Sequence, residues 1–176
     1  GARWAPENLE GSGAAMETGA TADHLLTFSD AQSSDGRHRV GYAFSHQAAA
    51  LAGSYDDYAV AVLDLGKAAG GEIDQHMFRD PTDGATYLLW KSDDNSVGAK
   101  TTRLWGQRAI VSAPHNVSLV GQRSLLLESD GLWWVTSFVA DGSLIEGPEL
   151  VYRGGWYYLF FASGCYCQQS YSEGVA

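Results

Sequence analysis

Short apolar and aromatic runs, bounded by glycine and acidic turn residues, dominate the hydrophobic pattern of this chain. Helical periodicity is weak, and the best helix candidate is the short alanine-rich stretch 47–51. Enrichment in aromatic and β-branched residues between turn signals instead predicts strands. The predicted strands are 25–29, 39–45, 77–79, 86–91, 109–112, 133–139, 149–152 and 156–162. The pattern therefore predicts an all-β protein.

Two pairs of predicted strands are joined by hairpin turn signals. Asp83-Gly84 precedes 86–91, and Gly154-Gly155 precedes 156–162. Asp-Gly and Gly-Gly favour the tight turns that connect adjacent antiparallel strands. We therefore expect at least two β-hairpins.

An acidic residue before a strand pair recurs along the chain. Glu146 opens the segment before 156–161, Asp74 opens the segment before 87–91, and a weaker copy starts at Trp4-Ala5-Pro6-Glu7. Strand onsets recur about every 60 to 70 residues, which is compatible with four-stranded propeller blades that carry long loops. We expect a piece of a β-propeller. Its approximate blades are 4–65, 72–130 and an incomplete 144–176, with second short strands at 40–43, 97–99 and 174–176.

Composition narrows the possible partners. The chain of 176 residues is long enough for a sizeable core, and its 21 Gly with six Trp, nine Tyr and six Phe argue against disorder. A formal net charge of -10 without a Lys/Arg cluster disfavours nucleic acid. The sequence contains no run of 18 or more apolar residues, so we expect no membrane partner. The first residues lack a signal-peptide layout, so we expect a secreted protein whose signal was removed or lies upstream, with a cytoplasmic location as the alternative.

The two cysteines, Cys165 and Cys167, are separated by one residue. In a strand their side chains share a face, and a bridge between them would strain the backbone, so we expect no disulfide between them. They read instead as small side chains near a blade edge, or as one half of a disulfide to another segment. A lone Cys-x-Cys without further ligands does not predict a metal site, and we expect no cofactor.

Three ordered motifs carry a family resemblance. Trp4-Ala5-Pro6-Glu7, then 73–78 followed by Asp83-Gly84 and 87–91, and finally 145–161 resemble glycoside hydrolase family 43 in order and spacing. The resemblance spans nearly the whole chain. It implies a five-bladed β-propeller, of which this chain covers about three blades without the first and last. Its members include β-xylosidases, α-L-arabinofuranosidases and endo-arabinanases that invert the anomeric carbon, so the implied substrate is a plant cell-wall oligosaccharide or polysaccharide containing arabinose or xylose.

The resemblance assigns roles to two carboxyl groups. Glu146 matches the general acid that protonates the leaving glycosidic oxygen. Asp74 matches the aspartate that keeps this acid protonated and helps to hold it in place. A neighbouring like charge in a partly dry funnel has that effect. Without the resemblance, Asp74 could equally cap a turn and Glu146 could be a solvated strand-end acid.

The family's general base has no counterpart in this chain. It is an aspartate upstream of the Trp-Ala-Pro motif, and Asp23, Asp30 and Asp35 lie in or beyond a predicted strand instead of at its mouth. Gln75 also departs from the family, which usually has proline there, and we expect it to loosen the local turn. We therefore expect a fragment that is hydrolytically inert by itself.

Three further residues are candidate substrate contacts. Trp4 could stack on a sugar ring. Glu7 lies at the start of the first repeat, as Asp74 and Glu146 do in theirs. It could contact a sugar hydroxyl or lie on the surface. His76 lies two residues after Asp74 and faces the same funnel if strand alternation holds, although a histidine there is often structural.

Two alternative functions remain open. Phe78-Arg79-Asp80-Pro81 is similar to the Arg-Asp-Pro motif of retaining fructosidases, in which Asp80 would replace Asp74 as the key residue. Those enzymes usually have Glu-Cys where this chain has Glu146-Gly147. The other alternative is a non-catalytic propeller that binds glycans, and it predicts binding that survives loss of the Glu146 carboxyl group.

Overall fold

The computed structural model describes a large part of the chain. The described residues are 3–12, 23–31, 35–45, 63, 65, 68–97, 101–112, 116–130, 132 and 144–176; side chains are described for all of these except 3–12, 23, 24, 30, 31, 45, 96 and 97. The predicted helix 47–51 and strand 133–139 lie outside the described residues. In the described part no helix is long and apolar enough to cross a bilayer.

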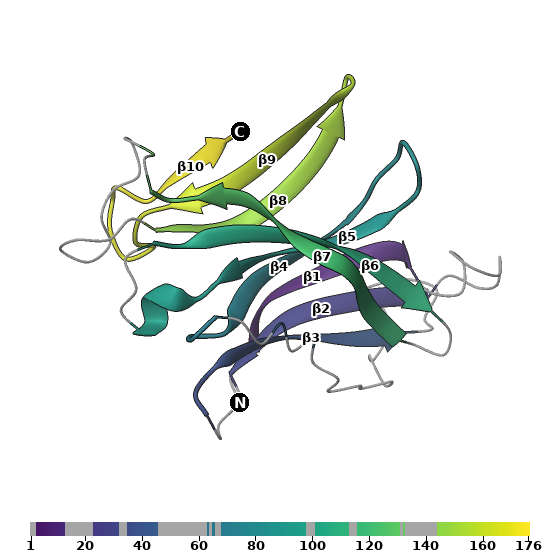
Figure 1. The fold of residues 1–176 in the computed structure, drawn as a ribbon, viewed down its shortest axis with the longest axis horizontal. Helices are drawn as coiled ribbons and strands as arrows, with labels where there is room; N and C mark the ends of the chain where they lie inside the picture. Colours follow the sequence, from purple (N-terminus) through teal and green to yellow (C-terminus); the bar gives the residue numbers. More distant parts are fainter. Residues whose placement is uncertain are drawn as a thin grey trace.

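Three antiparallel sheets follow one another along the chain and stack as layers, with the second sheet in the middle (Figure 1). The first contains β1 (Arg3–Ser12), β2 (Asp23–Ala31) and β3 (His38–Ser45); the middle contains β4 (Glu72–Arg79), β5 (Thr86–Ser92), β6 (Arg103–Ser112) and β7 (Asn116–Glu128); the third contains β8 (Ile145–Arg153), β9 (Trp156–Ser163) and β10 (Ser172–Val175). A short 3-10 helix, Asp94–Val97, follows β5. Within each sheet, strands that follow one another in sequence are paired, as in a propeller blade.

Both expected hairpins are confirmed. β8 and β9 are joined by Gly154 and Gly155, whose φ values of 62° and 87° suit a type I′ turn. β4 and β5 are joined by a longer turn, in which the amide of Asp80 donates to Ala85 O and the amide of Gly84 donates to Asp80 O. The strand expected at 97–99 is wrong, because Val97 ends the 3-10 helix.

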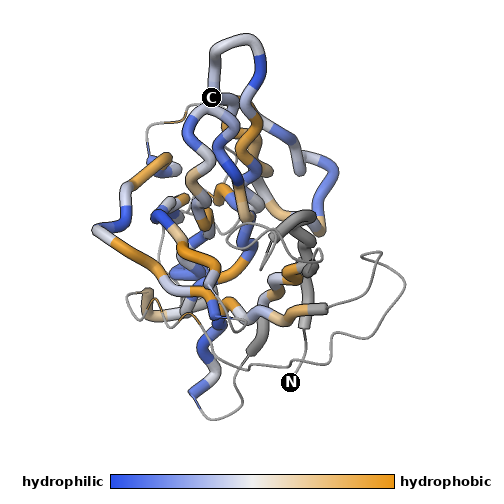
Figure 2. Tube along the Cα trace, turned by 90° about the vertical axis from the view of Figure 1, so that its right-hand side faces the viewer, coloured by the Kyte–Doolittle hydropathy of each residue, from blue (hydrophilic) through white to orange (hydrophobic). Residues whose placement is uncertain are grey.

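The core has two parts, one on each face of the middle sheet. Successive residues of a strand point to opposite faces, so Met77 packs toward the first sheet and Phe78 toward the third. Figure 2 shows hydrophobic stretches along the strands and hydrophilic ones at the loops. The first cluster joins Leu25, Tyr42, Phe44, Met77, Leu88, Trp90, Ala109, Val111 and Val117; the second joins Phe78, Leu89, Leu104, Ile145, Leu159 and Phe161. β4 is therefore packed between the other two sheets.

The first and middle sheets approach closely at Gly71, just before β4. Gly71 forms a parallel bridge with His38, and the amide of His38 donates to Gly70 O at 3.0 Å. Its φ is +91°, and a Cβ atom at this position would overlap the backbone of His38. Only glycine meets both requirements without strain.

We predict that Gly71→Ala destabilises the fold much more than Gly84→Ala. Both positions have positive φ, which costs an L-residue roughly 1–2 kcal/mol. A Cβ at Gly84 meets nothing within 4 Å, whereas at Gly71 it meets backbone. Urea unfolding of the two variants measures the difference, and equal losses would contradict the close approach.

Candidate active site

Asp74 lies on a β-bulge in β4. Ile73 pairs with Lys91 and His76 pairs with Leu89, so β4 carries one extra residue between these pairs. Asp74 has φ +54°, and it is the one non-glycine residue with positive φ in the described part. A bulge changes the direction of a side chain. A non-glycine residue with left-handed backbone is uncommon and is often found at functional sites, which makes Asp74 a candidate site residue.

Ser29 in β2 holds this bulge. Its Oγ accepts a hydrogen bond from the Asp74 amide at 3.1 Å and donates to Gln75 Oε1 at 2.9 Å. Ser29 and Gln75 are both buried. The expectation that Gln75 loosens the turn is therefore wrong, because its side chain ties the bulge to the first sheet.

Glu146 reaches Asp74 from the third sheet. It is the second residue of β8, next to a register shift between Glu146 and Glu149. The amide of Gly147 donates to Asp74 Oδ2 at 3.3 Å. The structure thus brings together the two carboxyl groups that the sequence singled out, from the first strands of two consecutive sheets.

Lys91 in β5 joins Glu146 to a buried ion-pair chain. Its Nζ donates to Glu146 Oε2 and to Asp93 Oδ1, both at 3.3 Å, and its side chain is 1% exposed. Asp93 Oδ2 lies 2.5 Å from His38 Nδ1 in the first sheet. A lysine is almost never fully buried without a charged partner. The carboxylates of Glu146 and Asp93 supply such partners for the Lys91 ammonium, whose burial would otherwise be costly.

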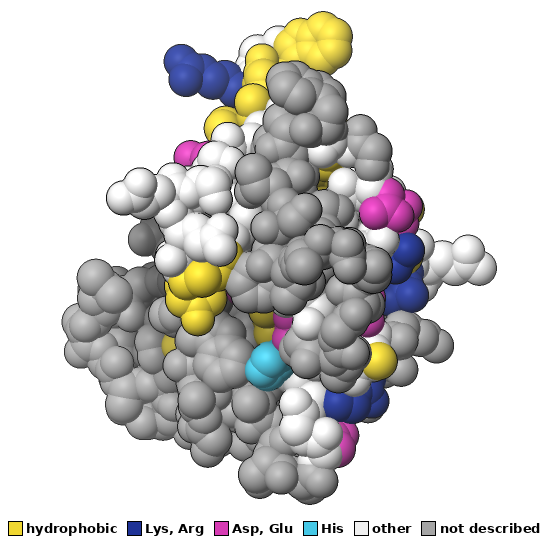
Figure 3. Space-filling model, turned by 90° about the vertical axis from the view of Figure 1, so that its left-hand side faces the viewer, with side chains coloured by type: hydrophobic (Ala, Val, Ile, Leu, Met, Phe, Trp, Pro, Cys, Tyr) yellow, Lys and Arg dark blue, Asp and Glu magenta, His cyan; other side chains and the backbone are white. Residues whose placement is uncertain are grey.

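Figure 3 looks onto the end of the molecule at which β8 begins. Described acidic and basic side chains adjoin on this face, and a histidine lies beside an acidic group. Sequence reasoning missed Lys91. The available signal was a charged residue directly after the apolar run 87–90, at the end of the predicted strand 86–91.

The environment of Asp74 favours its protonated form. Burial raises the pKa of the Asp74 carboxyl, the negative charges of Glu146 and Asp93 act in the same direction, and Lys91 and the Gly147 amide oppose them. Two adjacent carboxyl groups with limited access to water resist carrying two negative charges. The pair Asp74 and Glu146 therefore suits chemistry that moves a proton.

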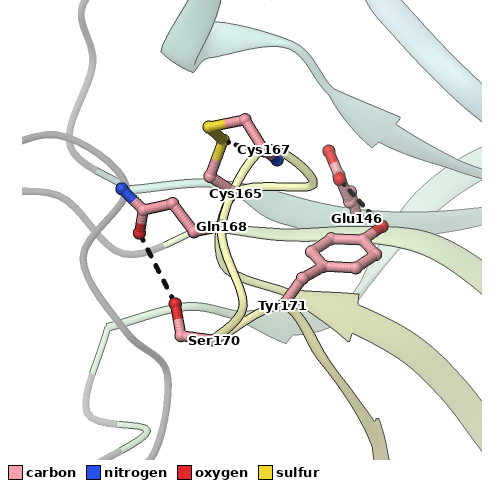
Figure 4. Close-up of a disulfide and its surroundings, with 6 residues drawn as sticks. All are labelled: Glu146, Cys165, Cys167, Gln168, Ser170 and Tyr171. Carbon is pink, nitrogen blue, oxygen red and sulfur yellow. Dashed lines mark hydrogen bonds between the residues drawn. A yellow bond between two sulfur atoms is a disulfide. The ribbon is translucent and has the colours of Figure 1, made fainter.

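Tyr171 contacts the other oxygen of Glu146. Its hydroxyl donates to Oε1 at 3.1 Å from the segment just before β10 (Figure 4). Burial raises the pKa of Tyr171, and the charge of Glu146 and the hydrogen bond itself raise it further. Tyr171 therefore stays protonated as a donor, and the two Glu146 oxygens have different partners. Sequence reasoning gave Tyr171 no role.

Two hollows differ in their chemistry. The larger, of about 570 Å³, borders β6 and β7 and is lined mainly by apolar groups without any carboxylate. The smaller, of about 360 Å³, borders Gly147 and Tyr171 and also contains Glu149 and Glu173. Size alone would select the first. The second includes Gly147 and Tyr171, which contact Asp74 and Glu146, but neither of those two carboxyl groups lines it, so we place the site by the carboxyl groups themselves.

Cys165 and Cys167 are joined by a disulfide, which corrects the expectation from sequence. They lie in turns after β9 and not in a strand, so their Cα atoms are 5.1 Å apart, within the usual disulfide range. The residues described by the structure include no group of three or more His, Cys, Asp and Glu side chains that could hold a metal ion.

Asp80 occupies a structural position. Its Oδ1 accepts from the amide and hydroxyl of Thr82, and its Oδ2 accepts from Tyr157 OH at 2.6 Å. These bonds hold the pKa of the Asp80 carboxyl below its usual value. Asp80 lies at the opposite end of β4 from Asp74, six residues and about 20 Å along the strand. The fructosidase-like assignment of Asp80 is therefore not supported by its position.

The remaining candidate contacts are less defined. The bulge separates His76 from Asp74, so the alternation argument that put both on one face does not hold across it. His76 as a substrate contact stays a prediction. The side chains of Trp4, Glu7, Asp23 and Asp30 lie outside the described part, and Asp35 pairs with Arg39.

Comparisons with known proteins agree with this geometry. The model of glycosyl hydrolases family 43 matches residues 4–176. A thermostable family-43 glycoside hydrolase is 24% identical with a TM-score of 0.75, covering 99% of this chain and 50% of that chain. An endo-arabinase from Bacteroides thetaiotaomicron is 16% identical with a TM-score of 0.70, covering 98% and 55%. An α-L-arabinofuranosidase from Lactobacillus brevis is 15% identical with a TM-score of 0.66, covering 98% and 48%.

The chain therefore spans about half the length of these solved structures. At these identities the likeness establishes the fold, and it confirms an all-β chain that covers about three blades of a five-bladed β-propeller. None of the curated proteins matches the chain. Because the family model matches almost every residue, the chain belongs to glycosyl hydrolase family 43.

Proposed function

We propose that this chain supplies the acid half of the active site of an inverting glycoside hydrolase, with Glu146 as the general acid and Asp74 as its supporting carboxylate. The contact from the Gly147 amide to Asp74 Oδ2 carries the proposal, because it places the two groups side by side. Family membership supports glycoside hydrolysis as the reaction class. The substrate would be a plant cell-wall polysaccharide such as a hemicellulose, cleaved at α-L-arabinofuranosyl or β-D-xylosyl linkages.

Protonated Glu146 would donate its proton to the leaving glycosidic oxygen. Before transfer, the nearby Asp74 disfavours a second negative charge on the pair. During transfer, negative charge develops on Glu146, next to the Lys91 ammonium and the Tyr171 hydroxyl. Groups placed in advance where charge develops lower the barrier without having to reorganise.

The general base would lie outside this chain. An inverting mechanism needs a second carboxylate about 6.5–9.5 Å from the acid, with room for water. Asp93 is the nearest further carboxylate in the charge chain, but it is buried and bonded to His38 and Lys91. The solved relatives are about twice as long, which leaves room for the missing group.

Secretion remains part of the proposal. The disulfide between Cys165 and Cys167 supports it, because such bonds persist mainly in oxidising compartments.

We predict that Glu146→Gln in the full-length protein lowers kcat on aryl pentosides by about 10²–10⁴-fold, as expected for loss of a general acid. Asp80→Asn is the matched control, because asparagine keeps an oxygen that can accept from Tyr157 OH, and it should keep wild-type kcat. Proton NMR of the first product should show inversion at the anomeric carbon. Retention, or loss of activity only in Asp80→Asn, would favour the fructosidase-like mechanism. Binding without turnover in every variant would favour the glycan-binding propeller.

We predict that Asp74→Asn loses activity but not stability. Asparagine tolerates positive φ and keeps an acceptor for the Gly147 amide. Burial raises the pKa of folded Asp74, so wild-type stability falls as pH rises from the ordinary value of 3.8 through the raised value. The variant should therefore have a Tm at least equal to wild type at pH 7, with the difference vanishing at pH values below the ordinary one. A lower Tm at pH 7 would contradict the burial argument.

We predict that the 176-residue chain alone gives no turnover of aryl arabinosides or xylosides, because the proposed base lies outside it. The full-length protein, assayed in parallel, should be active. Measurable turnover by the isolated chain that disappears in Glu146→Gln would show that the base lies within these residues.

A further inference from the structure

The connection between β9 and β10 passes directly beside Glu146. Glu146 pairs with Ala162, Ile145 pairs with Ser163, and Ser163 also pairs with Ser172 at the start of β10. The segment 164–171 therefore leaves and returns at the level of the acid. Its last residue, Tyr171, donates to the Glu146 carboxylate.

Two consecutive turns connect the disulfide to Tyr171. The amide of Gln168 donates to Cys165 O at 2.9 Å, and the amide of Tyr171 donates to Gln168 O at 3.2 Å. The amide of Cys167 also lies 3.1 Å from Cys165 Sγ. Cys165 is buried just after β9, so these bonds connect Tyr171 to a residue held against the sheet. Figure 4 shows the disulfide and Tyr171 on the same segment.

The rest of the segment is exposed. Residues 166–170 are all exposed, and Tyr166, between the two cysteines, is 81% exposed. Segments with little apolar burial are held mainly by local bonds and open readily. The Cys165–Cys167 cross-link restricts the backbone at the start of this segment. Tyr171 is therefore held from both sides, by the disulfide through the two turns and by the pairing of the next residue, Ser172, with Ser163.

We propose that Tyr171 is a positioning residue for Glu146 and that the Cys165–Cys167 disulfide fixes it in place. This rests on the proposed function of Glu146 as the general acid. The hydroxyl orients Oε1 while Lys91 holds Oε2, which sets the direction in which the acid presents its proton. A dithiol reductant would convert the bond to two cysteine thiols, becoming a disulfide itself, and would release Tyr171 from this constraint.

The proposal predicts a shift in pH dependence. The alkaline limb of the kcat/KM profile reports loss of the proton from the general acid. The Tyr171 hydroxyl donates to the carboxylate and so stabilises its charged form. Tyr171→Phe should therefore move this limb upward by on the order of one pH unit. Reduction of the disulfide should move it in the same direction by a smaller amount.

The test uses the full-length protein as wild type, reduced wild type, Tyr171→Phe, Cys165→Ala/Cys167→Ala and Tyr166→Phe. Tyr166→Phe is the matched control, since it removes a hydroxyl from the same loop without touching Glu146, and it should leave the limb unchanged. If the double cysteine variant does not fold, reduction of wild type and its reversal by reoxidation supply the same comparison.

A second readout separates this proposal from the proposed function. A carbon NMR titration of the Glu146 carboxyl, assigned with Glu146→Gln, reports its proton without turnover. A shift in Tyr171→Phe and in reduced protein supports the positioning role even if no substrate is cleaved. The same titration curve in wild type, reduced protein and Tyr171→Phe overturns it. A shift on reduction that Tyr171→Phe does not share also overturns it, since the disulfide would then act by another route.

Discussion

The buried ammonium group of Lys91 is the interaction on which the site depends most. A cation with 1% of its side chain exposed is costly unless its partners compensate for lost water. Its partners come from different places: Asp93 follows the same strand, and Glu146 belongs to the next sheet. Asp93 in turn meets His38 in the first sheet. The ion pairs that hold the candidate site therefore also join the three sheets.

The bulge at Asp74 is the second constraint. Before it, β4 approaches the first sheet through Gly71; after it, Met77 and Phe78 alternate regularly into the two cores. Ser29 fixes the bulge from one side, and the Gly147 amide meets its carboxylate from the other. A strained backbone conformation persists when its surroundings determine it this strongly. Asp74 thus receives its position from both neighbouring sheets.

Sequence reasoning worked where structure is local. Gly154-Gly155 predicts its hairpin because the turn chemistry lies within the residues themselves. It missed β1, where proline and glycine interrupt the pattern, and β7, whose run of leucines at 125–127 does not alternate and which contains Gly121 at φ 73°. The pair Asp74 and Glu146 was found from repeat position and family resemblance.

Other parts of the site depended on contacts that a sequence does not display. Lys91 and Tyr171 contact Glu146 from separate parts of the sequence, and these contacts form only in the folded chain. The sequence argument against a disulfide assumes that Cys165 and Cys167 lie in a strand, whereas a turn brings their Cα atoms to 5.1 Å. His76 was placed by alternation, which one inserted residue interrupts.

The hydrogen bond from Tyr157 to Asp80 also affects the geometry of the site, because of where it lies. It fastens the third sheet to the middle one at the end of β4 remote from Asp74, while Gly147 fastens them near Asp74. Two bodies joined at one point can pivot, but two well-separated fastenings remove that freedom. The spacing of the Asp74 and Glu146 carboxyl groups is then set by contacts between the middle and third sheets at both ends of β4.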